Sequence, residues 1–139
     1  MKKYVLLLYL ACFVSSPGHA FAWGQTGHRV IGQIAEENLS GRSRAEIELI
    51  LDGEGLAEAS TFADEERSNP SPFWQKDAPP WHYVTIPQGR TYDEMNAPPE
   101  GDAVTALQRF SSVVRNKGSS KAEKAVALRI LIHIVGDLH

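Results

Sequence analysis

The chain has 139 residues, a formal net charge of −3 and a single cysteine, and 42% of its residues are hydrophobic. This length allows one compact domain at most. The acidic balance excludes a protein that coats nucleic acid with a basic surface, and a lone cysteine excludes a disulfide within the chain.

Residues 1–22 have the features of a secretory signal peptide. Lys2 and Lys3 precede an apolar run over residues 4–14, and residues 20–22 read Ala-Phe-Ala, a small-residue cleavage site. The apolar run is too short to span a bilayer, so we predict no membrane anchor. We expect cleavage before Trp23 and export, either as a secreted or as a periplasmic protein. The single folded domain is expected over residues 23–139, with a net charge of −5, because it loses two of the 14 basic residues and keeps all 17 acidic ones.

Helical spacing of apolar residues begins soon after the predicted cleavage site. We expect Thr26 to cap the first helix, because threonine is a common N-cap and apolar residues follow it at helical intervals. Ser43 and Glu46 have the spacing of a capping box, which predicts the start of a second helix. Gly53 is expected to end that helix.

The rest of the chain predicts further helices around one proline-rich loop. A third short helix is expected over residues 56–67, and seven of the eight prolines lie between residues 70 and 99, which indicates a loop. Within this loop, residues 81–86 suit a short extended piece. Helical pattern resumes at residues 103–114, and a capping box at residues 120–123 starts the last helix. We therefore predict an all-α, mainly helical fold.

The last helix is the most distinctive part of the sequence. It is almost entirely apolar from Ala122 onward, which indicates burial on most sides. His133 and Asp137 interrupt it, and their four-residue spacing places both on one face. Burying an imidazole and a carboxylate costs free energy unless each has a partner. Two explanations fit: a buried hydrogen bond between the two residues, or a metal ion held by both.

The chain stops at His139, within this expected core helix and without a C-cap residue. We therefore expect either a longer protein or a gene product that is truncated inside a core helix. On this reading Ile130, Ile134 and Leu138 lack packing partners.

Four more residues have both an ordinary and a functional interpretation. Asp64 fits a solvated helical acid, His82 a packed loop histidine, and Trp23 a core anchor. Arg67 fits a surface residue of the same helix as Asp64. Singly, none of them identifies a site.

Four short motifs occur in order along the chain. They are Trp-Gly-x-x-Gly-His at residues 23–28, Ala-Asp-Glu-x-Arg at 63–67, Trp-His-Tyr-Val at 81–84, and His-x-Val-Gly-Asp-x-His at 133–139. In this combination the sequence resembles the mung-bean type of single-strand-specific nucleases, the class I zinc-dependent nucleases of the phospholipase C/nuclease superfamily. The resemblance implies the mainly helical fold of that superfamily.

The resemblance also implies a cluster of three zinc ions. The expected ligands of the first zinc are Asp64, His82, His133 and Asp137. The expected ligands of the second are the amino group and carbonyl of Trp23, His28, and Asp137 as a bridge. The third zinc of the family uses a histidine four positions beyond His139 and a later His/Asp pair, so this sequence contains ligands for two of the three ions.

Substrate roles follow from the same resemblance. Arg67 matches an arginine that faces the phosphate, and with Asp137 it is an expected catalytic residue. Tyr83 matches an aromatic residue that stacks on a base, and stacking favours single strands, whose bases are free to unstack. The family commonly has an aspartate at the position of Thr85, so base preference stays open.

The implied function is a secreted zinc-dependent endonuclease that hydrolyses phosphodiester bonds of single-stranded DNA and RNA to 5′-phosphate products. Its expected partner is the single-stranded nucleic acid substrate, and we expect a monomer without a stable protein partner. Two alternatives remain. A zinc-dependent phospholipase C uses a similar ligand set, and an inactive metal-binding fragment of the nuclease fold would agree with the missing third site.

Overall fold

The computed structural model describes residues 24–139, so the predicted signal peptide and the predicted role of Trp23 lie outside the described residues. Within this range the chain is helical and contains no β-strand, which confirms the all-α fold class. None of the helices in residues 24–139 combines the length and the apolar character needed to cross a membrane.

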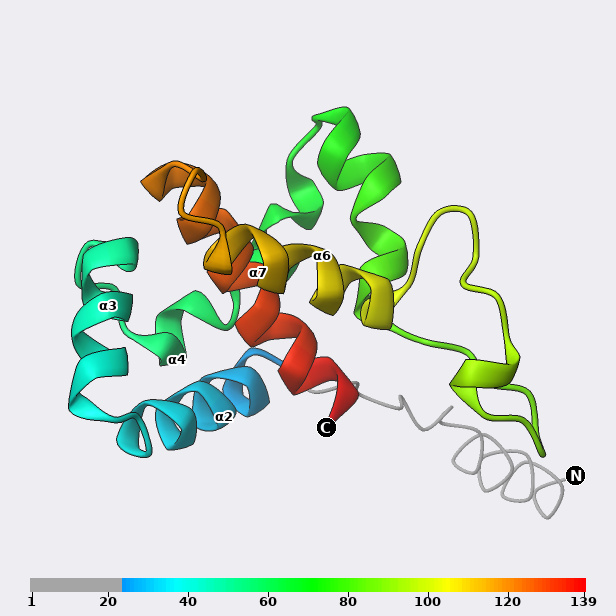
Figure 1. Cartoon of the computed structure of the whole chain (residues 1–139), viewed down its shortest axis with the longest axis horizontal. Coiled ribbons are helices and arrows are strands. Elements are labelled where there is room, and N and C mark those ends of the chain that lie inside the picture. Colours follow the sequence, from blue (N-terminus) through cyan, green and yellow to red (C-terminus); the bar gives the residue numbers. More distant parts are fainter. Residues whose placement is uncertain (1–23) are drawn as a thin grey trace, which may run out of the picture.

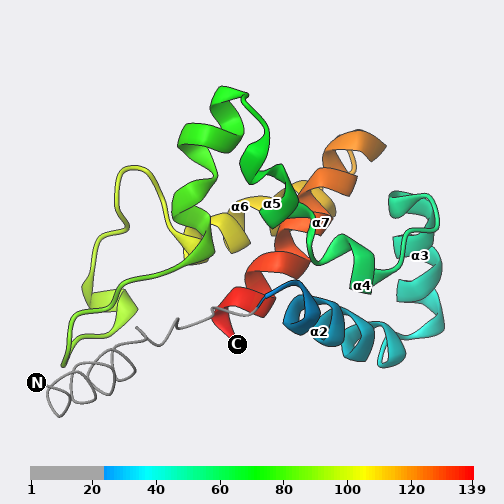
Figure 2. The same ribbon diagram turned by 180° about the vertical axis from the view of Figure 1, so that it is seen from behind.

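Four longer helices form the body of the molecule. They are α2 (Gln25–Glu37), α3 (Gly41–Leu51), α6 (Ala103–Arg115) and α7 (Lys121–Leu138). Helix α7 runs through the middle; α6 crosses one of its faces and the segment around α5 crosses the opposite face (Figures 1 and 2). Helix α2 packs against the C-terminal part of α7.

Short helices connect α3 to α6. They are α4 (Leu56–Ala59), α5 (Phe62–Glu65), the 3-10 helices η1 (Glu66–Ser68), η3 (Pro79–His82) and η4 (Tyr92–Glu94), and the π-helix η2 (Phe73–Asp77). We refer to residues 56–82 as the connecting segment. It lies along the face of α7 that is visible in Figure 2.

The first two helices begin earlier than the sequence predicted. Gly24, not Thr26, is the N-cap of α2, and Thr26 lies inside the first turn. Helix α3 begins at Gly41, because Ser40 has an extended backbone and its side chain accepts a hydrogen bond from the Ser43 N–H at 3.1 Å. The predicted capping box at Ser43 is therefore wrong. The helix ends at Leu51, and its C-cap Asp52 adopts the left-handed conformation with φ 56°.

The predicted continuous helix over residues 56–67 is also wrong. The helix is interrupted at Ser60 and Thr61, whose side-chain hydroxyls lie 2.7 Å from the Ala57 carbonyl and 3.1 Å from the Glu58 carbonyl. Such side-chain bonds to the backbone compete with helical bonds. The chain turns here and starts again as α5.

The predictions for the last two helices are confirmed, and the prediction for residues 81–86 is correct in part. The helix expected over residues 103–114 is α6, and the capping box of Ser120 with Glu123 starts α7 as predicted. The extended piece expected at residues 81–86 is correct only from Tyr83 onward, because residues 81 and 82 belong to η3. It pairs with no strand among the described residues.

The core lies on both faces of α7. One apolar cluster joins Trp81 and Phe110 to Ile130 and Ile134 of α7, and these two isoleucines are each 1% exposed. The prediction that they lack packing partners is therefore wrong, although Leu138 is 40% exposed. A second cluster joins Leu51 and Leu56 to Ala125 of α7, and this burial on two sides explains why the helix is so apolar.

Candidate metal centre

The C-terminal half of α7 presents His133 and Asp137 toward His82, which ends the connecting segment. The Asp137 Oδ2 atom lies 2.9 Å from His82 Nδ1 and 3.1 Å from His133 Nε2. His133 Nε2 and His82 Nδ1 are 3.0 Å apart. Three potential metal-binding atoms thus converge on one point, although their residues are up to 55 positions apart in the chain.

His133 is held in one orientation by the break in the connecting segment. Its side chain is fully buried, and its Nδ1–H donates to the Ser60 carbonyl at 2.7 Å. This bond leaves the Nε2 lone pair of the neutral ring directed at the cluster. Histidines that bind metals are commonly oriented by such a bond from their other nitrogen.

Asp64 adds a second carboxylate from α5. Its Oδ1 atom lies 3.8 Å from His133 Nε2. The same oxygen lies 3.0 Å from Arg67 Nε, one turn further along the chain. Asp64 therefore stands between the cluster and an arginine whose side chain is 64% exposed.

His28 completes the cluster from α2. Its ring stacks on that of His133 with centroids 4.2 Å apart, and its Nε2 atom lies 3.3 Å from Asp137 Oδ1. The side chain is 1% exposed, and neither ring nitrogen has a hydrogen-bond partner within residues 24–139. Leaving a buried polar atom without a hydrogen bond costs free energy, so a metal ion bound to this ring would offset that cost.

Gly136 leaves open the space that the His28 ring occupies. A Cβ atom on residue 136 would lie 2.6 Å from His28 Nδ1, closer than packed atoms can approach. The glycine of the His-x-Val-Gly-Asp motif therefore lets the ring of one helix lie against the backbone of another. The sequence reasoning did not assign this role, because the spacing of the motif does not show which side chain faces the glycine.

The electrostatics of the cluster favour a cation. Burial, together with the neighbouring His133, lowers the pKa of His28 below 6.5, so this ring stays neutral. Burial alone would lower the pKa of His133, but hydrogen bonds to Asp137 and the Ser60 carbonyl outweigh it and raise that pKa above 6.5. Burial would likewise raise the pKa of Asp137, but hydrogen bonds from His133 and His82 hold it well below its usual range.

These residues fit a zinc ion in two overlapping sets. The donor atoms of Asp64, His82 and His133 all lie within 4.8 Å of one another, as do those of His28, His133 and Asp137. Tetrahedral zinc with bonds of about 2.0–2.1 Å to nitrogen and oxygen separates its donors by about 3.3 Å. The distances of 3.0–3.8 Å from His133 Nε2 to the other donors bracket this value. Nitrogen and carboxylate donors are also the ligands that zinc prefers.

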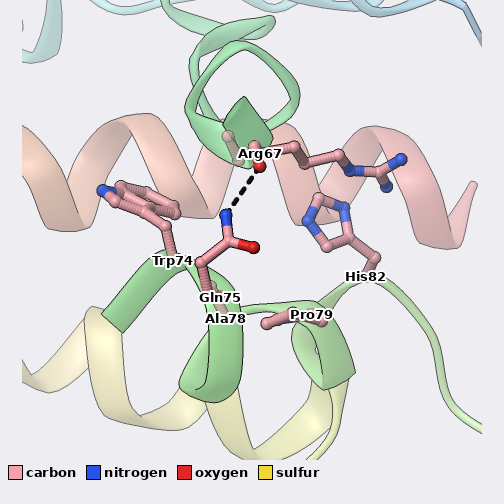
Figure 3. A pocket seen from close by; sticks show the side chains of 7 residues that line it. Arg67, Trp74, Gln75, Ala78, Pro79 and His82 are labelled. Carbon is pink, nitrogen blue, oxygen red and sulfur yellow. Dashed lines mark hydrogen bonds between the residues drawn. The ribbon is translucent and has the colours of Figure 1, made fainter. Parts of the chain in front are cut away.

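A pocket of about 280 Å³ adjoins the cluster (Figure 3). It is lined by Ala63, Arg67, Trp74, Gln75, Ala78, Pro79 and His82. His82 belongs to both sites, since its ring lines the pocket and its Nδ1 atom reaches Asp137. Trp74 and Gln75 were not candidates from the sequence, because a π-helix in a proline-rich stretch has no pattern that predicts it.

Tyr83, expected to stack on a base, is not one of the residues that line this pocket. Its side chain is 60% exposed. Its backbone carbonyl accepts a hydrogen bond from the Ala103 N–H at 3.0 Å, which ties the chain after His82 to the start of α6.

The fold and the cluster define a class: an all-helical domain that gathers imidazoles and carboxylates around a candidate metal centre. A family model described as S1/P1 Nuclease matches residues 23–139, and the chain belongs to this family. The resemblance seen in the four sequence motifs is thereby confirmed, and nuclease membership holds at the level of the family.

Individual relatives are distant. The chain is 25% identical over 128 residues to Nuclease S1 of Aspergillus oryzae, in a match that covers 86% of this chain and 43% of that protein. It is 25% identical over 124 residues to Nuclease P1 of Penicillium citrinum, covering 84% of this chain and 45% of that protein. The chain thus spans less than half the length of these relatives.

Proposed function

We propose that the protein is a zinc-dependent endonuclease that hydrolyses phosphodiester bonds of single-stranded DNA and RNA and leaves 5′-phosphate products. One observation carries this proposal. Three imidazoles and two carboxylates from α2, α5, η3 and α7 meet in a chain of the S1/P1 nuclease family, and one of the imidazoles is buried with no hydrogen bond to its ring nitrogens among the described residues.

The proposed zinc ligands form two sets that share one residue. The first set is Asp64, His82, His133 and Asp137, and the second is Trp23, His28 and Asp137. The position of Asp137 supports its shared role, because its two oxygens face different histidines: Oδ2 faces His82 and His133, and Oδ1 faces His28. Bound zinc would supply an activated water at neutral pH and neutralise charge on the phosphate.

Other residues would act on the substrate directly. Arg67 would bind a phosphate oxygen: its Nε contacts Asp64, its side chain is 64% exposed, and its Nη atoms form no hydrogen bond or ion pair within residues 24–139. Arginine suits this task because its donors match the geometry of phosphate oxygens. Tyr83 would stack on an unpaired base, and its exposed ring is accessible for stacking.

The domain and localisation proposals concern the start of the chain. Residues 1–22 would be a signal peptide, and residues 23–139 a zinc-dependent nuclease domain exported to the periplasm or the medium. A Trp23 amine can bind zinc only after cleavage at this point. We also propose that the protein acts as a monomer.

The test measures cleavage and metal together. Purified protein is incubated with denatured DNA, native DNA and RNA, release of acid-soluble nucleotides is followed with and without a chelator, and zinc per chain is measured by elemental analysis. We expect chelator-sensitive cleavage that prefers denatured DNA and is lost in Asp137→Asn. Release of phosphocholine from phosphatidylcholine vesicles without DNA cleavage would favour a phospholipase C. Zinc binding with neither activity would favour an inactive metal-binding role.

A further inference from the structure

We propose that the pocket between Trp74 and His82 binds a nucleobase next to the cleaved phosphate, and that Gln75 recognises an N–H group on the edge of that base. This inference rests on the proposed nuclease function for its substrate class. It concerns a different place from Tyr83, which does not line the pocket.

The amide of Gln75 is oriented by the backbone of the connecting segment. Its Nε2 group donates to the Arg67 carbonyl at 2.9 Å and to the Asn69 carbonyl at 2.8 Å. Both N–H groups are therefore used, and the oxygen, which can only accept, is left for a ligand. Figure 3 shows this oxygen on the side of the pocket toward His82.

The walls of the pocket suit a flat ring. The indole of Trp74 stands on the side away from His82, where edge contacts to Phe62 and Phe73, with centroids 5.6 Å and 4.9 Å apart, hold it in place. Pro79 adds a second apolar wall. Stacking on an aromatic side chain tolerates any base, since every base has a π-face.

The polar groups at the rim of the pocket indicate that the bound base carries a phosphate. Arg67 lines the same pocket, and Figure 3 shows its guanidinium beside His82. A cation there attracts the phosphate of a nucleotide whose base lies deeper. Because His82 also reaches Asp137, that phosphate would lie between the pocket and the candidate metal centre. A nucleotide fits this order of groups: base, then phosphate, then metal.

The test uses three small ligands and needs neither metal nor catalysis. Binding of adenosine 5′-monophosphate, purine riboside 5′-monophosphate and ribose 5-phosphate is measured by calorimetry in the presence of a chelator, with the side-chain amide signal of Gln75 followed by NMR. Purine riboside lacks the 6-amino group but keeps the ring. We expect adenosine monophosphate to bind about fivefold more tightly than the purine riboside and at least about tenfold more tightly than ribose 5-phosphate.

Variants test whether the preference among the three ligands arises in the pocket. In Gln75→Met the preference for the amino group should disappear while ribose 5-phosphate binds as before. Trp74→Phe keeps a ring against Phe62 and should weaken both purine ligands by the same factor. Gln33→Met on α2, a glutamine that is also exposed and lies away from the pocket, is the matched control and should change nothing.

The opposite results would overturn the subsite. Equal binding of all three ligands, binding of none, or an equal loss of all three in Gln75→Met would show that the pocket does not recognise a base. This outcome is separable from the proposed function. Chelator-sensitive cleavage of denatured DNA without base binding would reject only the subsite, and base binding without cleavage would reject only the nuclease.

Discussion

The two sides of the candidate metal centre are built in different ways. Helix α7 is regular, starts at a capping box and places His133 and Asp137 on one face by simple helical spacing. The connecting segment supplies Asp64 and His82 through short turns of α-, π- and 3-10 helix. Helix α7 sets the positions of its two donors, and the turns of the connecting segment bring Asp64 and His82 to them. The donors of the connecting segment therefore depend on its breaks, whereas those of α7 depend only on helical spacing.

The largest expected effect comes from removing the donor that α7 places at the centre. Asp137 faces His28 with one oxygen and His82 and His133 with the other, and we propose that it serves both zinc ions, whereas Asp64 would serve one. We expect Asp137→Ala to lower zinc affinity by more than about 100-fold, since groups that only orient a ligand already contribute about 10- to 100-fold. Asp64→Ala should retain part of the zinc. Elemental analysis after dialysis and chelator competition measure both, with circular dichroism of the metal-free variants as the folding control. Equal losses would show that α7 contributes no more than the connecting segment.

The next effect is the pH dependence of zinc binding. The pKa of His133 is raised above 6.5, so zinc must displace a proton from this ring as the pH falls through that pKa. Each proton displaced lowers the zinc affinity by up to about tenfold per pH unit. His28, whose pKa is lowered, should contribute only at a lower pH. Competition titrations between pH 8 and pH 5 check this, and a pH-independent affinity would show that His133 is not a ligand.

In the metal-free protein, the stability of the fold should change with pH in the direction opposite to the zinc affinity. Its His133 pKa is raised in the folded state, so the interaction with Asp137 stabilises the fold fully below the unfolded pKa near 6.5. That contribution is lost as the pH rises through the folded pKa. Adding a chelator should therefore reverse the pH trend of the melting temperature around this pKa.

A smaller effect tests the contact between α7 and α2. Gly136→Ala would place a methyl group 2.6 Å from His28 Nδ1, and the His28 ring cannot retreat freely because it stacks on His133. We expect a loss of about 1–3 kcal/mol in the free energy of unfolding, which the better helix propensity of alanine offsets only in part. Gly41→Ala is the control, because nothing lies within 4 Å of its added Cβ. A melting temperature of Gly136→Ala equal to that of the control would show that the contact is loose.

The same contrast explains what the sequence could predict. The final helix, its capping box and the spacing of His133 and Asp137 follow from local patterns, because a regular helix repeats one geometry. The convergence of His28, Asp64 and His82 was expected only from the resemblance to a family. The Ser60 carbonyl, the π-helix and the pocket were missed, since they depend on backbone breaks that no periodicity reports.

The smallest expected effect concerns the break in the connecting segment at Ser60 and Thr61. Thr61 is 1% exposed, and its hydroxyl lies 3.1 Å from the Glu58 carbonyl and 2.7 Å from Glu65 Oε1. Thr61→Val keeps the shape and removes this hydroxyl. The loss should be about 1 kcal/mol in the free energy of unfolding, measured by urea denaturation of the metal-free protein.

The matched control lies on a regular helix. Ser112 of α6 is exposed, and its hydroxyl donates to the Gln108 carbonyl at 2.9 Å, so Ser112→Ala removes a similar bond without a break to maintain. Its cost should stay within about 0.5 kcal/mol. Thr61→Val should in addition weaken zinc binding, because residue 60 supplies the carbonyl that orients His133. If both substitutions cost the same and zinc affinity is unchanged, packing around Ser60 rather than hydrogen bonding maintains the break.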